Sequence, residues 1–235
     1  MGSFRFVRHG QASLFKADYD ELSPLGRDQA AAFGKALAAR GDVPTAVFHG
    51  PARRQRDTAA LAAEHASGDW PGASEIAGLD EHDAFGMLRR VLPKLGGDAA
   101  VAEAQAQMAA ADTSAKKSRA FQMLFEAVMT RWLAGDVEAD DAETWPAFRM
   151  RVLGALEQML SSSAGGAKIL AFSSVGPLAV ILQRALGTDD LASFRTAWRF
   201  RNAAVAAFVF RGDALTLDGF NDLSHLPDPR HHTFR

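Results

Sequence analysis

The chain has 235 residues, of which 48% are apolar, and a formal net charge of −2. This length suits one α/β domain with an inserted subdomain, and the apolar content is enough for a sizeable core. The nearly neutral charge is unlike that of a nucleic-acid-binding domain. Because the chain has no cysteine, it cannot form a disulfide, a catalytic thiolate or a cysteine-ligated zinc site.

The N-terminus and the longest apolar run predict a cytoplasmic protein. No basic region followed by an apolar segment opens the chain, so no signal peptide is expected. The run "ILAFSSVGPLAVIL" is too short to span a bilayer, and it is interrupted by two serines and by Gly176–Pro177. We therefore expect no membrane association, and the sequence leaves the oligomeric state open.

Strand-like and helix-like segments alternate in the first third of the chain. The first predicted helix has Ser23 as its N-cap, Pro24 in its first position and Gly41 as its stop. The second helix is predicted to begin at or near Pro51. The expected strands lie within residues 3–7, 45–50 and 74–82, and the expected helices within 23–41 and 51–66.

The pattern changes between about residues 85 and 145, where the sequence is rich in alanine and methionine and is helix-like throughout. A helix, a buried-type strand, a second helix and a hairpin turning at Gly212–Asp213 follow, at residues 145–160, 167–174, 176–187 and 202–221. This order predicts a three-layer α/β/α sandwich with a mostly parallel sheet. We expect residues 1–235 to form a single domain, with the 85–145 block inserted as a helical cap.

Polar residues follow three of the predicted strands: Arg8–His9, His49 and Ser173–Ser174. In open α/β sheets, ligands bind beyond the carboxyl ends of the strands. We therefore expect these residues to converge on one edge of the sheet.

The tripeptide Arg8–His9–Gly10 has the chemistry of a phosphate site. A neutral imidazole is a competent nucleophile, and a guanidinium binds phosphate through several donors. Gly10 permits a tight turn and the close approach of a ligand. Taken alone, the tripeptide also fits an ordinary surface loop.

Arg53, Arg54 and Arg56 are predicted in the first turn of the second helix, where cations oppose the helix dipole. A bound anion would reverse this unfavourable interaction with the helix dipole. The alternative is that the long arginine side chains simply extend into water. Glu81 follows the third predicted strand. A carboxylic acid beside bound phosphate has a raised pKa and can protonate a leaving oxygen.

Together and in this order, "VRHGQ", "LSPLGRDQA", "GPARRQRDTA", "LDE" and the late strand–turn–helix resemble the histidine phosphatase superfamily, which has the phosphoglycerate mutase-like fold. The resemblance covers nearly the whole chain. It implies a metal-independent phosphomonoester hydrolase that needs no cofactor and acts on a small phosphorylated substrate.

The resemblance also implies a role for individual residues. His9 matches the family's nucleophile, which forms a phosphohistidine. Arg8 and Arg54 match its two phosphate-binding arginines, and Glu81 matches its usual general acid.

One position departs from the family pattern. Ser174 stands where a second histidine is usual, and Val175 replaces a glycine. The chain is similar here to a subgroup that opens with Arg-His-Gly-Gln-Ala-Ser and also has serine at this place. Serine offers a neutral phosphate-binding hydroxyl, so by analogy with the loss of one oxyanion donor the rate falls by about 10²–10³.

Another histidine is a candidate to replace the missing one. We take His49 as the phosphate-binding candidate because of its place at a strand end; the alternative is a partly exposed histidine without a role. His82 and His225 are the other histidines near the matched motifs.

Three further functions compete with the phosphatase. A catalytically weak or inactive protein of the same fold would bind phosphate or a phospholigand. A mutase must exclude water from a phosphorylated intermediate, and the sequence gives no sign of that. A serine hydrolase would use Ser174 with Asp218 and His225, although "FSSVG" lacks the first glycine of a nucleophile elbow.

Overall fold

The computed structural model describes residues 1–12, 20–136, 143–162 and 166–234. These residues form two compact units. Unit 1 comprises Met1–Glu81 and Met150–Arg235, and unit 2 comprises His82–Arg149. Among the described helices, none combines the length and the apolar character that a membrane crossing requires.

Unit 1 is built on a six-stranded sheet with the order β3-β2-β4-β1-β5-β6. The pairs β1–β4, β2–β4 and β2–β3 are parallel, whereas β5 is antiparallel to both of its neighbours. The predicted mostly parallel sheet is therefore confirmed. The strands are β1 (Gly2–Arg8), β2 (Ala46–His49), β3 (Ala73–Glu75), β4 (Lys168–Ser173), β5 (Val205–Arg211) and β6 (Ala214–Asp222).

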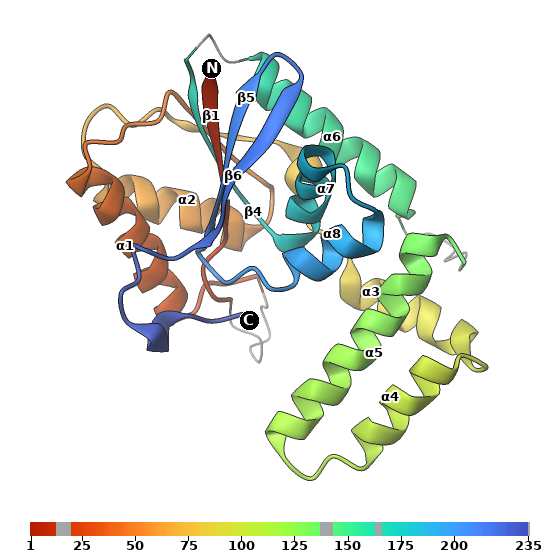
Figure 1. Ribbon diagram of the computed structural model, residues 1–235. Coiled ribbons are helices and arrows are strands. Elements are labelled where there is room, and N and C mark those ends of the chain that lie inside the picture. Colours follow the sequence, from red (N-terminus) through yellow and green to blue (C-terminus); the bar gives the residue numbers. More distant parts are fainter. Residues whose placement is uncertain (13–19, 137–142, 163–165, 235) are drawn as a thin grey trace. The chain divides into compact units, whose positions relative to one another are not determined.

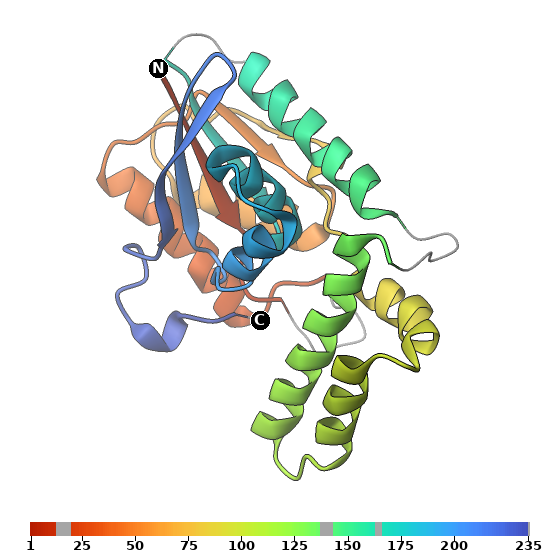
Figure 2. The same ribbon diagram turned by 45° about the vertical axis from the view of Figure 1, so that its right-hand side comes forward.

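Helices cover both faces of this sheet, which confirms the predicted three layers (Figure 1). α1 and α2 lie on one face, and α7 and the unit 1 part of α6 lie on the other (Figure 2). The helix α8 has no counterpart among the predicted elements. The bounds are α1 (Pro24–Ala39), α2 (Arg53–His65), α6 (Trp145–Ser161), α7 (Val175–Leu186) and α8 (Asp190–Ala197).

The core beneath α1 and α2 explains why the strands form where they do. Aliphatic and aromatic side chains of β1, β2, β4 and β5 face small and large apolar residues of the two helices. β4 is buried along its length after Lys168, as its continuous apolar run predicts. The cluster comprises Val7, Phe33, Leu37, Val47, Ala59, Ala62, Leu170, Phe172 and Val205.

The loop after β1 passes directly over the start of α1. A Cβ atom on Gly10 would collide with the backbone of Gly26, and a Cβ atom on Gly26 would collide with the backbone of Gln11. Ser23 caps α1 as predicted, because its hydroxyl accepts the Gly26 N–H at 3.0 Å. The buried Gln29 side chain accepts the Gln11 N–H at 2.9 Å. These contacts fix the backbone immediately after His9.

The described part of unit 2 consists of helices, turns and connecting segments: α3 (Ala84–Val91), a 3-10 helix (Leu92–Leu95), α4 (Ala99–Ala109) and α5 (Ser114–Ala134), followed by the start of α6. α4 and α5 pack around Val101, Ala104 and Leu124. The imidazole of His82 stacks on the indole of Trp132, with ring centroids 5.3 Å apart, within an aromatic cluster that includes Phe148. His82 is thus a core residue of this unit. The role of unit 2 as a cap stays a prediction.

Candidate active site

The carboxyl ends of β1 and β4 lie side by side. Arg8 is paired with Ser173 in the parallel register, and the His9 N–H donates to the Ser173 carbonyl at 2.9 Å. His9 and Ser174 are the next residues on the two strands. The structure therefore brings these two candidates to the same edge of the sheet, because adjacent parallel strands end together.

The hydrogen bonds of His9 define its tautomer. Nδ1 lies 2.7 Å from the Gly10 carbonyl oxygen, which can only accept, so Nδ1 carries the proton. Nε2 then holds the lone pair, and Arg54 Nε donates to it at 3.3 Å. His9 is only 6% exposed. Burial, with the charges of Arg54 and Arg8, holds the pKa of His9 well below its usual range. The ring is therefore a neutral base with its lone pair on Nε2.

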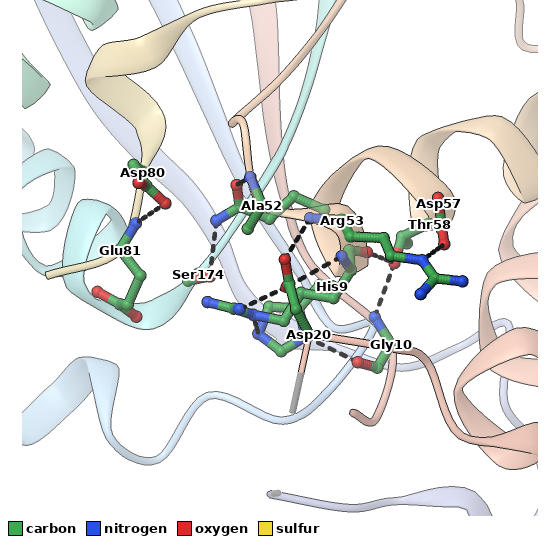
Figure 3. Close-up of polar contacts among 12 residues, drawn as sticks. His9, Gly10, Asp20, Ala52, Arg53, Asp57, Thr58, Asp80, Glu81 and Ser174 are labelled. Atoms are coloured by element: carbon green, nitrogen blue, oxygen red, sulfur yellow. Dashed lines mark hydrogen bonds and ion pairs between the residues drawn. The ribbon is translucent and has the colours of Figure 1, made fainter. Parts of the chain in front are cut away.

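Arg54 is held by a carboxylate that the sequence analysis missed. Arg54 Nη1 lies 2.7 Å from Asp20 Oδ1, and the Asp20 carboxylate also accepts the backbone N–H groups of Arg53 and Arg54, at 2.7 and 3.3 Å (Figure 3). The Asp20 carboxylate therefore lies at the start of α2, where the helix dipole favours an anion. Nothing in "DYDE" distinguishes this residue from its acidic neighbours.

Of the three arginines at the start of α2, Arg54 is the one that contacts His9. The side chain of Arg53 is 41% exposed and pairs with Glu21 and Asp57. The side chain of Arg56 is 54% exposed and also pairs with Asp57. Helical spacing explains the difference, because consecutive residues on a helix point in different directions.

Arg8 is buried, and its Nη1 donates to the carbonyl of Phe200, in the segment that precedes β5. This bond fixes the guanidinium beside the sheet edge. From there its charge contributes to the lowered pKa of His9.

Ser174 is the N-cap residue of α7, but its hydroxyl does not cap the helix. Instead Ser174 Oγ accepts a hydrogen bond from Gln55 Nε2 at 2.8 Å. The Gly176 N–H of the same helix donates to Glu81 Oε2 at 3.2 Å. Glu81 and Ser174 therefore meet at the start of α7, where backbone donors and the helix dipole favour an anion.

Glu81 is held in place through its backbone. Arg151 Nη1 donates to the carbonyls of Gly78 and Asp80, at 3.1 and 2.8 Å, and Asp80 Oδ1 accepts the Glu81 N–H at 2.8 Å. Burial raises the pKa of Asp80. A Cβ atom on Gly78 would lie 2.6 Å from the Arg151 carbonyl oxygen, so only glycine lets this turn approach α6 so closely.

His49 is the last residue of β2, the strand beside β4. It pairs with Phe172 in the sheet, and its Nδ1 lies 2.7 Å from the Gly50 carbonyl oxygen. The side chain lines a surface cavity of about 650 Å³ together with Arg56 and Trp70, on the α2 face of the sheet. The phosphate-binding role of His49 therefore stays a prediction.

The residues of the alternative serine hydrolase are not assembled. Asp218 lines a cavity with Ser3 and Lys168, which lie at the amino ends of β1 and β4. About 20 Å of extended strand separates that end from Ser174. His225 packs edge-on against Phe33, with ring centroids 5.3 Å apart. Asp218 therefore lies too far from Ser174 to serve in the triad that this alternative requires.

Within residues 1–12, 20–136, 143–162 and 166–234, no group of three or more histidine, aspartate and glutamate side chains is placed to hold a metal ion.

Solved structures show where this fold occurs. A phosphoserine phosphatase from Entamoeba histolytica is 16% identical, with a TM-score of 0.63, over 96% of this chain and 100% of that one. A phosphoglycerate mutase from Bacillus anthracis is 17% identical, with a TM-score of 0.62, over 95% of this chain and 94% of that one. A mycobacterial glucosyl-3-phosphoglycerate phosphatase in complex with inorganic phosphate is 19% identical, with a TM-score of 0.63, over 96% of this chain and 100% of that one.

At these identities the likeness establishes the fold, which is phosphoglycerate mutase-like. The comparison with curated proteins gave no match. The family model of the histidine phosphatase superfamily (branch 1) matches residues 4–90 and 87–223. These two matches together extend over most of the chain, and they include the segments that carry His9, Arg54, Glu81 and Ser174. The chain therefore belongs to the histidine phosphatase superfamily.

Proposed function

We propose that the protein is a phosphomonoester hydrolase that acts through a phosphohistidine on His9 and needs no metal. The observation that carries this proposal is the state of His9. Its buried ring is neutral, has its lone pair on Nε2 and has a guanidinium directly beside that atom. A phosphoryl group placed there would meet a nucleophile and a fixed positive charge together.

In the first step, the lone pair of His9 Nε2 attacks the phosphorus atom. Arg54 Nε–H, which now points at Nε2, turns to a phosphoryl oxygen and so releases the lone pair. The bond between phosphorus and the ester oxygen breaks. Glu81, protonated on one oxygen, gives its proton to the departing alcohol. The products are an alcohol, a phosphohistidine and the Glu81 carboxylate.

In the second step, water attacks the phosphorus atom of the phosphohistidine. The Glu81 carboxylate takes a proton from that water, and the bond between phosphorus and Nε2 breaks. Inorganic phosphate leaves, and His9 and Glu81 return to their starting states. The Ser174 hydroxyl supplies a neutral donor to the phosphoryl oxygens in both steps.

A second candidate is a phosphate-binding protein of the same fold with little turnover. Two observations favour it. Arg54 is already paired with Asp20, and Ser174 supplies a neutral donor where the family has a histidine. Both features weaken the stabilisation of a transferring phosphoryl group while leaving a site for an anion.

Hydrolysis of an aryl phosphate, with a chelator present and from acid to mildly alkaline pH, separates the two candidates. We expect the native protein to turn over and His9→Ala to lose at least about 10⁴-fold in kcat, as when a covalent nucleophile is removed. Acid quenching during turnover should trap an acid-labile phosphoprotein in the native protein alone. Phosphate binding without His9-dependent turnover would instead support the binding protein.

A further inference from the structure

The residue that faces Ser174 has no assigned role. Gln55 lies in the first turn of α2, one position after Arg54, and is fully buried, as is Ser174. Amide Nε2 of Gln55 lies 2.8 Å from Ser174 Oγ. A buried polar pair at the edge that carries His9 calls for an explanation, because burying an amide without good hydrogen bonds is costly.

The orientation of the Gln55 amide follows from its neighbours. The Ala52 N–H lies 3.2 Å from Oε1 and can only donate, so this atom must be the carbonyl oxygen. The Leu79 carbonyl lies 3.5 Å from Nε2 and can only accept. Both neighbours give the same assignment. The atom that faces Ser174 is therefore the NH₂ group.

This assignment determines what the Ser174 hydroxyl can do. A serine hydroxyl has one proton and two lone pairs. Since Gln55 Nε2–H occupies a lone pair, the proton of Ser174 is left for another acceptor. The Ser174 side chain does not cap α7, so within the described residues Gln55 is the partner of this hydroxyl.

We propose that Gln55 is a positioning residue that makes Ser174 a hydrogen-bond donor to the phosphoryl group. The inference rests on the proposed phosphatase function. In it, the Gln55–Ser174 pair takes the role of the second histidine that the family usually has at this position, which is a single charged donor. The NH₂ group of Gln55 prevents the hydroxyl from turning its proton toward α2. It also polarises the O–H bond, because hydrogen bonds in a chain strengthen one another.

A double-mutant cycle tests this inference with four proteins: native, Gln55→Met, Ser174→Ala and the double variant. The readouts are kcat/KM for an aryl phosphate and the Kd of inorganic phosphate. We expect Ser174→Ala to lower kcat/KM by about 10²-fold, as for the loss of an oxyanion donor. Gln55→Met should lower it by about 10-fold in the Ser174 background, the scale of one hydrogen bond, and by no more than about twofold in the Ser174→Ala background.

A merely structural role gives a different result. Gln55 also binds the Ala52 N–H, so its loss could displace α2 and Arg54. That displacement would lower activity equally in both backgrounds, and additive effects would therefore overturn the inference. If Gln55→Met fails to fold, as judged by thermal unfolding, Gln55→Glu takes its place in the cycle. Glutamate keeps the acceptor for Ala52 and removes the donor to Ser174. The Kd of inorganic phosphate controls for the added charge of glutamate. Any repulsion of phosphate raises Kd equally in both backgrounds, so the inference is judged on the difference in kcat/KM between the two backgrounds.

The same experiment separates this inference from the function on which it rests. If hydrolysis by the native protein persists in His9→Ala, the proposed function fails whatever the cycle shows. If hydrolysis depends on His9 and the two substitutions are additive, the role of Gln55 fails and the phosphatase stands.

Discussion

The two sides of the candidate site differ in the groups that line them. On the side of β1 and α2, the imidazole of His9 contacts Arg54, which is paired with Asp20, and the charge of Arg8 helps to lower the pKa of His9. On the side of β4 and α7, a serine hydroxyl and an amide form a neutral pair, with a glutamate at the start of the helix. Burial, together with the charges on the side of β1 and α2, keeps the nucleophile neutral. On the side of β4 and α7, the serine and the amide can only orient donors, so their contribution depends more on geometry than on charge.

The largest effect should come from the charged side. Arg54→Ala removes the cation beside His9 Nε2, and we expect kcat/KM for an aryl phosphate to fall by about 10²–10³-fold. Arg53→Ala is the matched control: it lies one residue away and is solvent-exposed, and it should change kcat/KM by less than about twofold. Equal losses of kcat/KM in the two variants would mean that activity depends on the total positive charge at the start of α2 and not on the contact between Arg54 and His9.

On the neutral side, Ser174→His tests how closely the pair is packed. The imidazole would enter a buried position 2.8 Å from the Gln55 amide, and overpacking of this kind costs about 1–3 kcal/mol. We expect Tm to fall by roughly 3–10 °C in thermal unfolding.

A second substitution, Gln55→Ala, should restore most of that Tm by making room for the imidazole. If Ser174→His alone leaves Tm unchanged, the space beside Ser174 is larger than these contacts indicate.

Asp20→Asn probes the carboxylate that now occupies the start of α2. The amide keeps the size of the side chain and an acceptor for Arg54, but removes a negative charge that competes with phosphate. We expect the Kd of inorganic phosphate to fall about 3–10-fold, since one charge at an effective dielectric constant near 20 is worth a few kcal/mol before screening.

Calorimetric titration of phosphate measures this change, and raising the salt concentration should reduce it. Weaker phosphate binding by Asp20→Asn would show instead that Asp20 is needed to hold Arg54.

The pKa of His9 should respond to the charge of Arg54, whereas the pKa of His225 should not. Burial lowers the pKa of His9 and that of His225, the latter to about 4, but Arg54 and Arg8 act on His9 alone. Arg54→Gln should move the pKa of His9 upward toward 6.5 and leave His225 unchanged. An NMR titration of the two imidazole rings measures both. A shift of both rings would indicate a general loosening of unit 1.

The same two histidines link stability to pH. An unfolded chain binds protons at both positions as the pH falls below about 6.5, whereas the folded protein does not until the pH reaches the lowered pKa values. The free energy of unfolding should therefore decrease as the pH falls from 6.5 to 4. His225→Phe, which keeps an aromatic ring against Phe33, should make that decrease smaller in denaturant titrations at the two pH values.

Much of the fold could be predicted from short-range patterns in the amino-acid sequence. The N-cap Ser23, the stop at Gly41 and the hairpin turn at Gly212–Asp213 lie where the sequence predicts them, because each depends on a short-range rule of backbone chemistry. The continuous apolar run of β4 predicts a buried parallel strand for a similar reason. The helix α8, which begins after its N-cap Asp189, was not predicted.

The features of the candidate site also fall into two groups, those that the sequence predicted and those that only the structure revealed. The amino-acid sequence by itself determined which segments end at the carboxyl edge of the sheet, and the order of its motifs indicated His9 and Arg54. Only the tertiary structure decided that Asp20 holds Arg54, that Gln55 faces Ser174, and that His49 lies on the α2 face. The reason is physical. Strand ends and caps follow from neighbours in the chain, whereas these contacts join residues 34 and 119 positions apart, and long-range packing alone brings such side chains together.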